Sequence, residues 1–173
     1  MKRFIAALLM LITLPLQADT VIRHLRGETP DDARNDYFLA MLTLALEKTA
    51  DEGSWQLQPS DEAMTQSRAL QKLSDGDGMD VVWSMTSIAR EQQNLPIRIP
   101  LLKGLMGYRL LIIRAEDQSW FRRVQTIDQL RELRAGQGHD WPDTDILRAN
   151  GLAVDATVDY DSLFRMLQLG RFD

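Results

Sequence analysis

Apolar residues recur with the spacing of an α-helix over the segment Ala33–Ala50. Tyr37, Met41 and Leu44 fall on one stripe of that helix, so one of its faces is apolar. This pattern predicts a long amphipathic helix. A second amphipathic pattern predicts another helix over Asp61–Ser74.

Short β-rich runs lie beside and between these two helices. They predict three strands, namely Thr20–Leu25, Trp55–Gln58 and Met79–Trp83. The resulting order of strand, helix, strand, helix and strand favours a parallel sheet covered by helices. Because ligands of such sheets bind at the carboxyl ends of the strands, we expect a site in the loops that follow the three strands.

The segment Leu95–Arg114 differs from what precedes it. It combines alternating apolar residues with two prolines and two glycines, and its apolar run Tyr108–Ile113 predicts a strand. We interpret the segment as a hinge where the chain leaves one sheet and enters another. Beyond it, the patterns predict a helix over Thr126–Arg134 with a capping box at Thr126 and Gln129, a helix over Pro142–Ala149, a strand near Ala153–Val158 and a helix over Tyr160–Leu169.

The segment Gly136–Gly151 is the sharpest local pattern in the chain. Gly136 and Gly138 predict a tightly turning loop, and Pro142 followed by two aspartates is typical of the first turn of a helix. Such a helix end can bind an anion through free backbone N–H groups, although the aspartates already occupy the favourable field. The alternative is an ordinary capped helix. Trp141 at this end either stacks on a ligand or fills the interior.

The N-terminal residues 1–18 have the layout of a secretory signal peptide. Lys2 and Arg3 form a short cationic start, the apolar run Phe4–Leu14 follows, and Ala18 marks the expected cleavage point. The apolar run is shorter than the roughly 20 residues that span a bilayer. We therefore expect a mature protein that is soluble and lies outside the cytoplasm, with a buried N-terminal helix or a retained anchor as the alternative.

Composition narrows the chemistry that the chain can perform. The chain has 173 residues, a net charge of −5 and no cysteine. The acidic balance argues against nucleic acid as a partner, and the missing cysteines exclude disulfides, thiolate catalysis and cysteine metal sites. His24 and His139 lie on separate segments without a metal-binding spacing, and no nucleophile motif is present. We expect no metal, no cofactor, no catalytic residues and no enzymatic activity.

Hydroxyl groups and an arginine follow the third predicted strand. Thr86, Ser87 and Arg90 would lie there at the ligand-binding end of the sheet, and a guanidinium can hold a carboxylate through two hydrogen bonds. Alternatively, Thr86 and Ser87 cap a short helix over Ile88–Gln93, and Arg90 lies in solvent. These residues alone favour neither interpretation.

Several segments together resemble the bacterial extracellular solute-binding proteins of family 3, which are the periplasmic receptors of amino-acid uptake systems. The resemblance covers nearly the whole mature chain and is carried by four segments: MDVVWSMTSIAR (79–90), IRIPLLKGLMGYRLLII (97–113), TIDQLRELRAGQGHDWPDTDILRANGL (126–152) and DYDSLFRMLQLGRFD (159–173). The chain departs from the family before the arginine, where Ile88 and Ala89 stand in place of the usual Pro-Glu and the spacing from the strand to the arginine is shortened.

The resemblance implies an α/β fold of the type II periplasmic-binding-protein kind, with a ligand clamped between two lobes. Residues 19–103 would form the first lobe, and residues 104–173 the hinge strand and an incomplete second lobe that lacks the family's return crossing. By their place in the motifs, the ligand-binding residues would be Thr86, Ser87 and Arg90 of the first lobe and Gly138, His139, Trp141 and Thr144 of the second.

The function that the resemblance implies is binding of a small polar or amino-acid-like ligand for an ABC transporter, with a membrane permease as the partner. The length of the chain leaves open that truncation makes this binding weak or inactive. The alternative is a periplasmic sensor or interaction module that contacts a membrane partner. A secreted hydrolase is a third interpretation, for which the sequence contains no catalytic constellation.

Overall fold

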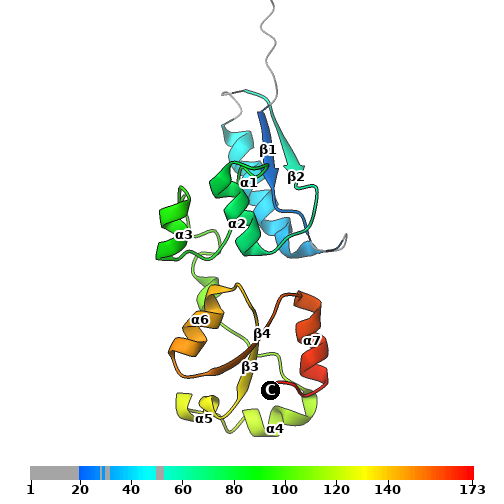
Figure 1. The fold of residues 1–173 in the computed structure, drawn as a ribbon, viewed down its shortest axis with the longest axis vertical. Helices are drawn as coiled ribbons and strands as arrows, with labels where there is room; N and C mark the ends of the chain where they lie inside the picture. Colours follow the sequence, from blue (N-terminus) through cyan, green and yellow to red (C-terminus); the bar gives the residue numbers. More distant parts are fainter. Residues whose placement is uncertain (1–19, 28, 30–31, 50–52) are drawn as a thin grey trace, which may run out of the picture.

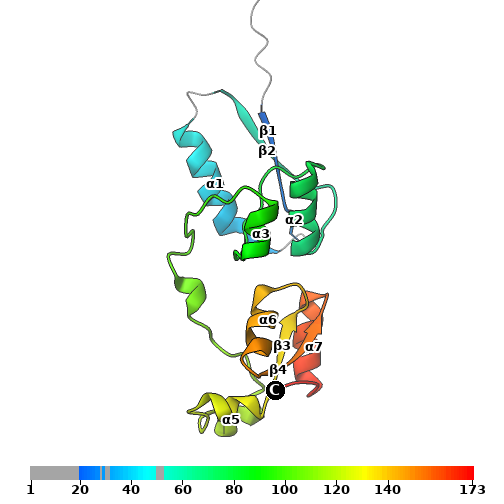
Figure 2. The same cartoon turned by 60° about the vertical axis from the view of Figure 1, so that its left-hand side comes forward.

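The computed structural model describes residues 20–27, 29, 32–49 and 53–173, and the predicted signal peptide over residues 1–18 lies outside them. The described chain forms two groups of helices and parallel strands joined by a long connector (Figure 1). We call residues 20–93 the N-lobe, residues 94–114 the connector and residues 115–173 the C-lobe. Figure 2 shows the connector running along one side of the molecule from one lobe to the other.

The N-lobe is built on the two parallel strands β1 and β2, which pair in register from Thr20 opposite Trp55 to His24 opposite Pro59. Its elements are β1 (Thr20–His24), the short 3-10 helix Ala33–Asn35, α1 (Asp36–Lys48), β2 (Trp55–Pro59), α2 (Gln66–Asp75) and α3 (Ile88–Gln93). The predicted third strand is reduced to one parallel bridge between His24 and Val81. The parallel arrangement expected from the order of the elements is present, but the sheet is narrower than the sequence predicts.

The interior of the N-lobe combines small apolar residues with an aromatic stack. Ala69 and Met79 are buried, and so is His24, which is 6% exposed. The ring of Trp83 stacks on Phe38 at 5.7 Å between centroids and lies 6.0 Å from the ring of His24. The stack therefore joins β1, α1 and the segment after Val81.

The connector contradicts one prediction, because residues 108–113, all of which the structure describes, form no strand. Its one regular element is the 3-10 helix Leu105–Gly107. Most apolar side chains of the connector lie in solvent, with Leu95 92% and Leu110 95% exposed. A strand needs a neighbour that completes its hydrogen bonds, and no described strand lies in register beside this run.

The C-lobe repeats the parallel arrangement with strands β3 and β4, which pair from Arg134 opposite Ala153 to Gly138 opposite Thr157. Its elements are the 3-10 helix Ala115–Asp117, α4 (Gln118–Phe121), α5 (Ile127–Arg131), β3 (Arg134–Gly138), α6 (Pro142–Ala149), β4 (Ala153–Thr157) and α7 (Tyr160–Gln168). Helices α6 and α7 both contact the two strands and flank them in Figure 1.

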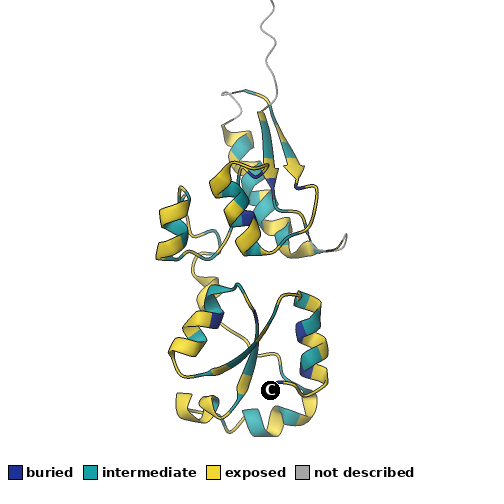
Figure 3. Cartoon of the chain, in the orientation of Figure 1, coloured by how far each residue is buried: buried dark blue, intermediate teal, exposed yellow. Residues whose placement is uncertain are grey.

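The core of the C-lobe lies between α7 and β3. Leu163, Leu167 and Phe172 form its buried cluster, and Trp141 packs against them. Figure 3 colours the buried positions of α7 dark blue. Arg114, at the end of the connector, donates a hydrogen bond to the carbonyl of Leu167 at 3.2 Å and another to the carbonyl of Phe172. The same guanidinium forms ion pairs with Asp117 at 2.6 Å and Asp173 at 3.5 Å, so it ties the connector to this core.

The prediction of a glycine loop before α6 is wrong in part. Gly136 and Gly138 belong to strand β3, and neither has a positive φ angle. They are required by close packing instead, because a Cβ at Gly136 would lie 2.1 Å from the ring of Phe172. Two other predictions are confirmed: α6 has the expected bounds, and Thr126 and Gln129 form the capping box of α5.

Candidate functional site

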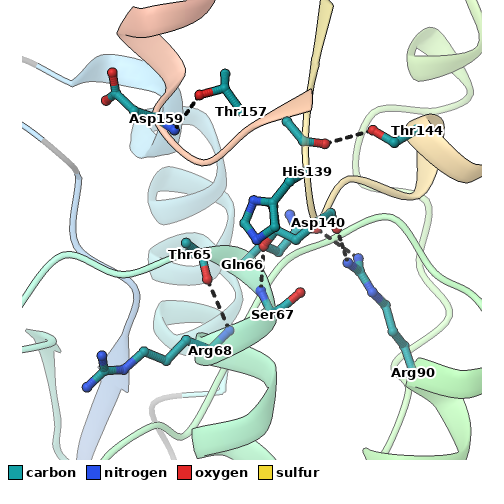
Figure 4. A network of polar contacts seen from close by, with 11 residues as sticks. Thr65, Gln66, Ser67, Arg68, Arg90, His139, Asp140, Thr144, Thr157 and Asp159 are labelled. Carbon is teal, nitrogen blue, oxygen red and sulfur yellow. Dashed lines mark hydrogen bonds and ion pairs between the residues drawn. The ribbon is translucent and has the colours of Figure 1, made fainter. Parts of the chain in front are cut away.

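The candidate site lies where three segments from the two lobes meet (Figure 4). They are the N-terminus of α2, the side chain of Arg90 on α3, and the turn from β3 to α6, which contains His139, Asp140 and Trp141. We call this place the interlobe site. The residues predicted from the sequence contribute to it unequally.

The N-lobe presents a helix N-terminus at this site. Thr65 is the N-cap of α2, with an extended backbone and a hydroxyl that accepts a hydrogen bond from the Arg68 N–H at 3.4 Å. Backbone N–H groups in the first turn of a helix have no partner within the helix and lie at its positive end. One of them, the N–H of Ser67, donates to the Asp140 carboxylate of the C-lobe at 2.9 Å.

Arg90 is the charged centre of the N-lobe side. Its guanidinium donates hydrogen bonds to four acceptors, namely Gln66 Oε1 at 2.8 Å, the Met85 carbonyl at 2.9 Å, the Asp140 carbonyl at 3.2 Å and the Ser84 hydroxyl. Burial lowers the pKa of Arg90 from its ordinary value, while the nearby Asp140 carboxylate acts in the opposite direction. The alternative in which this arginine lies in solvent is therefore wrong.

The two hydroxyl residues before Arg90 serve helix α3. Ser87 is its N-cap, and the Ser87 hydroxyl accepts a hydrogen bond from the Arg90 N–H at 3.3 Å. Thr86 donates to Glu91 Oε1 at 2.8 Å. Hydrogen bonds from Arg98 and then from Thr86 lower the pKa of the Glu91 carboxyl. Both side chains thus hold α3 in place, as the capping interpretation predicts for Ser87.

Three of the predicted C-lobe residues shape the turn before α6. Thr144 is fully buried, and its hydroxyl donates to the carbonyl of Gly138 at 2.7 Å. Gly138 lies against the indole of Trp141, where a Cβ would come within 2.5 Å of the ring. The partly buried indole also packs on the core cluster of the lobe, as the interior interpretation of Trp141 predicts, and its stacking on a ligand stays a prediction.

His139 is the predicted residue whose side chain remains at the surface of the turn. Its backbone N–H donates to the carbonyl of Thr157 at 2.9 Å, and its Nδ1 lies 3.8 Å from Asp140 Oδ1. The described part of the chain contains no group of three or more His, Cys, Asp or Glu side chains that could hold a metal ion. The contacts that the structure shows at the interlobe site are hydrogen bonds and closely placed charges.

Candidates from the sequence lie on two of the three segments that meet here, but three further residues of the interlobe site were missed. Ser67, Gln66 and Asp140 were not among the candidates, although Asp140 lies within the turn singled out before α6. A contact between residues 73 positions apart leaves no local pattern in the sequence. Asp140 could have been flagged only as the acidic residue between His139 and Trp141 at a helix start.

A hollow of about 330 Å³ lies elsewhere in the N-lobe, at the loop after β2 and the turn after α2. Most charged side chains that line it already form ion pairs within the protein, because Glu62 pairs with Arg68 at 2.8 Å and Asp77 with Lys72 at 2.9 Å. None of the predicted site residues lines it. The interlobe site is the better candidate, because there an arginine and a helix N-terminus face residues of the other lobe.

Comparison with known proteins adds no relative, since the chain matches no family model and no curated protein. Among the helices that the structure describes, none has the length and apolar character needed to cross a membrane. What the chain does must accordingly be argued from the interlobe site.

Proposed function

We propose that the chain is an exported, periplasmic solute-binding module that holds a small amino-acid-like ligand between its two lobes. The proposal includes a type II periplasmic-binding-protein fold, with residues 19–103 as one lobe and residues 104–173 as the hinge and the other lobe. It also includes delivery of the ligand to a membrane permease.

One observation carries the proposal: the N-lobe directs two kinds of donor at a polar turn of the C-lobe. These donors are the backbone N–H of Ser67 and the guanidinium of Arg90. A ligand carboxylate is suited to both, because helix N-termini and arginines bind anions with directed hydrogen bonds. Two lobes that are joined by a connector along one side can also close on a ligand, as hinged binding domains do.

Calorimetric titration of the full chain with L-amino acids, one at a time, tests this proposal. We expect at least one of them to bind, and the variant Arg90→Met to bind it at least ~10-fold more weakly, since a charge-assisted hydrogen bond contributes about 1.5–3 kcal/mol. The matched control is Arg123→Met, which removes an exposed arginine outside the interlobe site and should bind like the wild type.

Two results would contradict the proposal. The first is the absence of both heat and a thermal shift with every amino acid of the panel. The second is binding by Arg90→Met that equals binding by Arg123→Met, which would place the ligand away from the interlobe site.

A second candidate function is an interaction module that contacts a membrane protein, and the exposed connector favours it. Connector residues such as Leu95, Leu110 and Ile112 hold large apolar side chains in solvent, and exposed apolar patches often mark protein interfaces. The variant Leu110→Asp should then abolish capture of a partner from envelope extracts while leaving amino-acid binding unchanged. Capture by the variant that equals capture by the wild type would reject this candidate.

A further inference from the structure

Asp140 joins the two lobes in a way that the proposed function does not require. Its carboxylate accepts a hydrogen bond from the Ser67 N–H, and its own carbonyl accepts one from Arg90. The C-lobe thus places a carboxylate of the chain itself on one of the donors that we assign to a ligand, the Ser67 N–H, and a backbone carbonyl on the other, Arg90.

From this geometry we infer that Asp140 is an internal stand-in for the ligand carboxylate. It latches the lobes together while no ligand is bound, and a ligand has to displace it. The inference rests on the proposed function for the identity of the competitor. The latch itself is a property of the chain and can be tested without any ligand.

The surroundings of the Asp140 side chain support this role. The side chain is only 10% exposed, and a carboxylate that has lost so much water needs donors or positive charge nearby. The positive end of helix α2 and the guanidinium of Arg90 supply both from the N-lobe. Asp140 is therefore held by the opposite lobe, with His139 Nδ1 at 3.8 Å as a neighbour within its own turn.

Two further polar contacts bring C-lobe residues onto cationic side chains outside that lobe. Asp143 of α6 pairs at 2.7 Å with Arg109 of the connector, and the guanidinium of Arg34 lies 4.2 Å from the ring centre of Tyr160. Polar contacts of this kind exchange with water or ligand at a small cost. An interface made of them can open once the carboxylate on Ser67 is replaced.

The latch is tested by the distance between the lobes in the full chain without ligand. The chain has no cysteine, so Glu47→Cys and Gln168→Cys, one in each lobe, can be spin-labelled without competing thiols. Electron–electron double resonance should give a longer and broader distance distribution for Asp140→Ala than for the wild type. Asp145→Ala, which removes an exposed aspartate of α6, is the matched control and should match the wild type.

The same variants, without the labels, are then titrated with L-amino acids and with the corresponding amino-acid amides, which lack the carboxylate. Asp140→Ala should bind an amino acid about 10-fold more tightly than the wild type, because the competing closed population is removed. The amides should show no such gain. Asp140→Asn keeps the size of the side chain but not its charge, so the distance between its lobes should be intermediate. It replaces Asp140→Ala in both measurements if Asp140→Ala does not fold.

The possible outcomes separate the latch from the proposed function. An unchanged distance in Asp140→Ala and Asp140→Asn overturns the latch, whatever the ligand data show. If the Asp140 variants give the longer distance but neither they nor the wild type bind any amino acid, the latch is supported and the solute-binding proposal is rejected. Opening with amino-acid binding no tighter than in the wild type overturns the role of Asp140 as a stand-in for the ligand.

Discussion

The two lobes have similar architecture but present opposite chemistry where they face each other. Each contains a pair of parallel strands with helices beside them. At the interlobe site the N-lobe offers donors, Ser67 N–H and Arg90, whereas the C-lobe offers the acceptors of Asp140. The two lobes thus recognise each other through charge and hydrogen bonds.

The interiors of the lobes differ as well. In the N-lobe an aromatic stack packs around the buried His24, whereas in the C-lobe an apolar cluster packs against strand β3. In the C-lobe, Phe172 lies directly on Gly136, so that side chain and strand fit without spare space. We expect the C-lobe to be the more sensitive of the two to changes in side-chain volume.

The largest expected effect comes from Phe172→Ala, which empties the centre of the C-lobe cluster. Phe172 is 7% exposed, and truncation of such a buried ring should lower the free energy of unfolding by about 3–5 kcal/mol. Urea unfolding followed by tryptophan fluorescence measures the change, since Trp141 packs on the same cluster. Phe164→Ala, at a ring that is 38% exposed, should cost clearly less, and equal losses would show that the cluster is not the core of the lobe.

Gly136→Ala should have the next largest effect, because its new methyl group has no space beside Phe172. The added Cβ would approach the ring to 2.1 Å, so ring or strand must move at a cost of about 1–3 kcal/mol. The matched control is Gly107→Ala in the connector, where no atom lies within 4 Å of an added Cβ and φ is not positive. Thermal unfolding of both variants gives the comparison, and two equal transition temperatures would contradict the packing shown at Gly136.

The fold could be predicted wherever the information was local. Helix α6 has the predicted bounds because Pro142 and Asn150-Gly151 define its two ends. The capping box of α5 was predicted because it depends only on Thr126 and Gln129, which are three positions apart. Strand β3 was missed because Arg134–Gly138 contains two glycines and no β-branched residue, so its pairing with β4 and its packing on Phe172 decide its structure. The reverse error arose at residues 108–113, which have strand composition but no pairing neighbour among the described strands.

The candidate site shows the same difference between local patterns, which can be predicted from the sequence, and contacts between elements, which cannot. The motif that contains Arg90 was a candidate in the sequence, and the cap formed by Ser87 was one of the two interpretations left open there. The contacts of Arg90 with Gln66 and with the Asp140 carbonyl depend on how α2, α3 and the turn before α6 come together. Sequence patterns describe single elements, so they can propose the members of such a site but not their partners.

A smaller effect should come from removing one helix cap in each lobe. Ser87→Ala and Thr126→Ala both delete a hydroxyl that accepts a hydrogen bond from a backbone N–H, and each should cost about 1 kcal/mol. Only Ser87→Ala should also disturb Arg90, because α3 carries that side chain. Chemical shifts of the Arg90 side chain, measured by NMR for both variants, test this difference. A larger shift change in Thr126→Ala than in Ser87→Ala would mean that α3 does not position the arginine.

The smallest expected effect depends on pH and concerns Asp159, the N-cap of α7 in the C-lobe. Ser162 donates to Asp159 Oδ2 through its hydroxyl and, at 2.8 Å, through its backbone N–H, and these bonds lower the pKa of the carboxyl from its ordinary value of 3.8. Since the pKa is lower in the folded protein, the ionised carboxylate stabilises the fold above the unfolded pKa. This contribution is lost as the pH falls below 3.8 and through the folded pKa.

Asp159→Asn should therefore lower the transition temperature slightly at pH 6, and the difference from the wild type should shrink as the solution is acidified below pH ~4, where the wild-type carboxyl also becomes neutral. Thermal unfolding monitored by circular dichroism between these pH values measures the trend, and Glu132→Gln, at an exposed position of the same lobe, is the control. A difference that stayed constant with pH would show that the Asn side chain weakens the cap through its geometry and that the charge of Asp159 contributes nothing. The stability of α7 would then depend on its apolar face, where Leu163 and Leu167 meet Phe172, as the contrast between the two interiors implies.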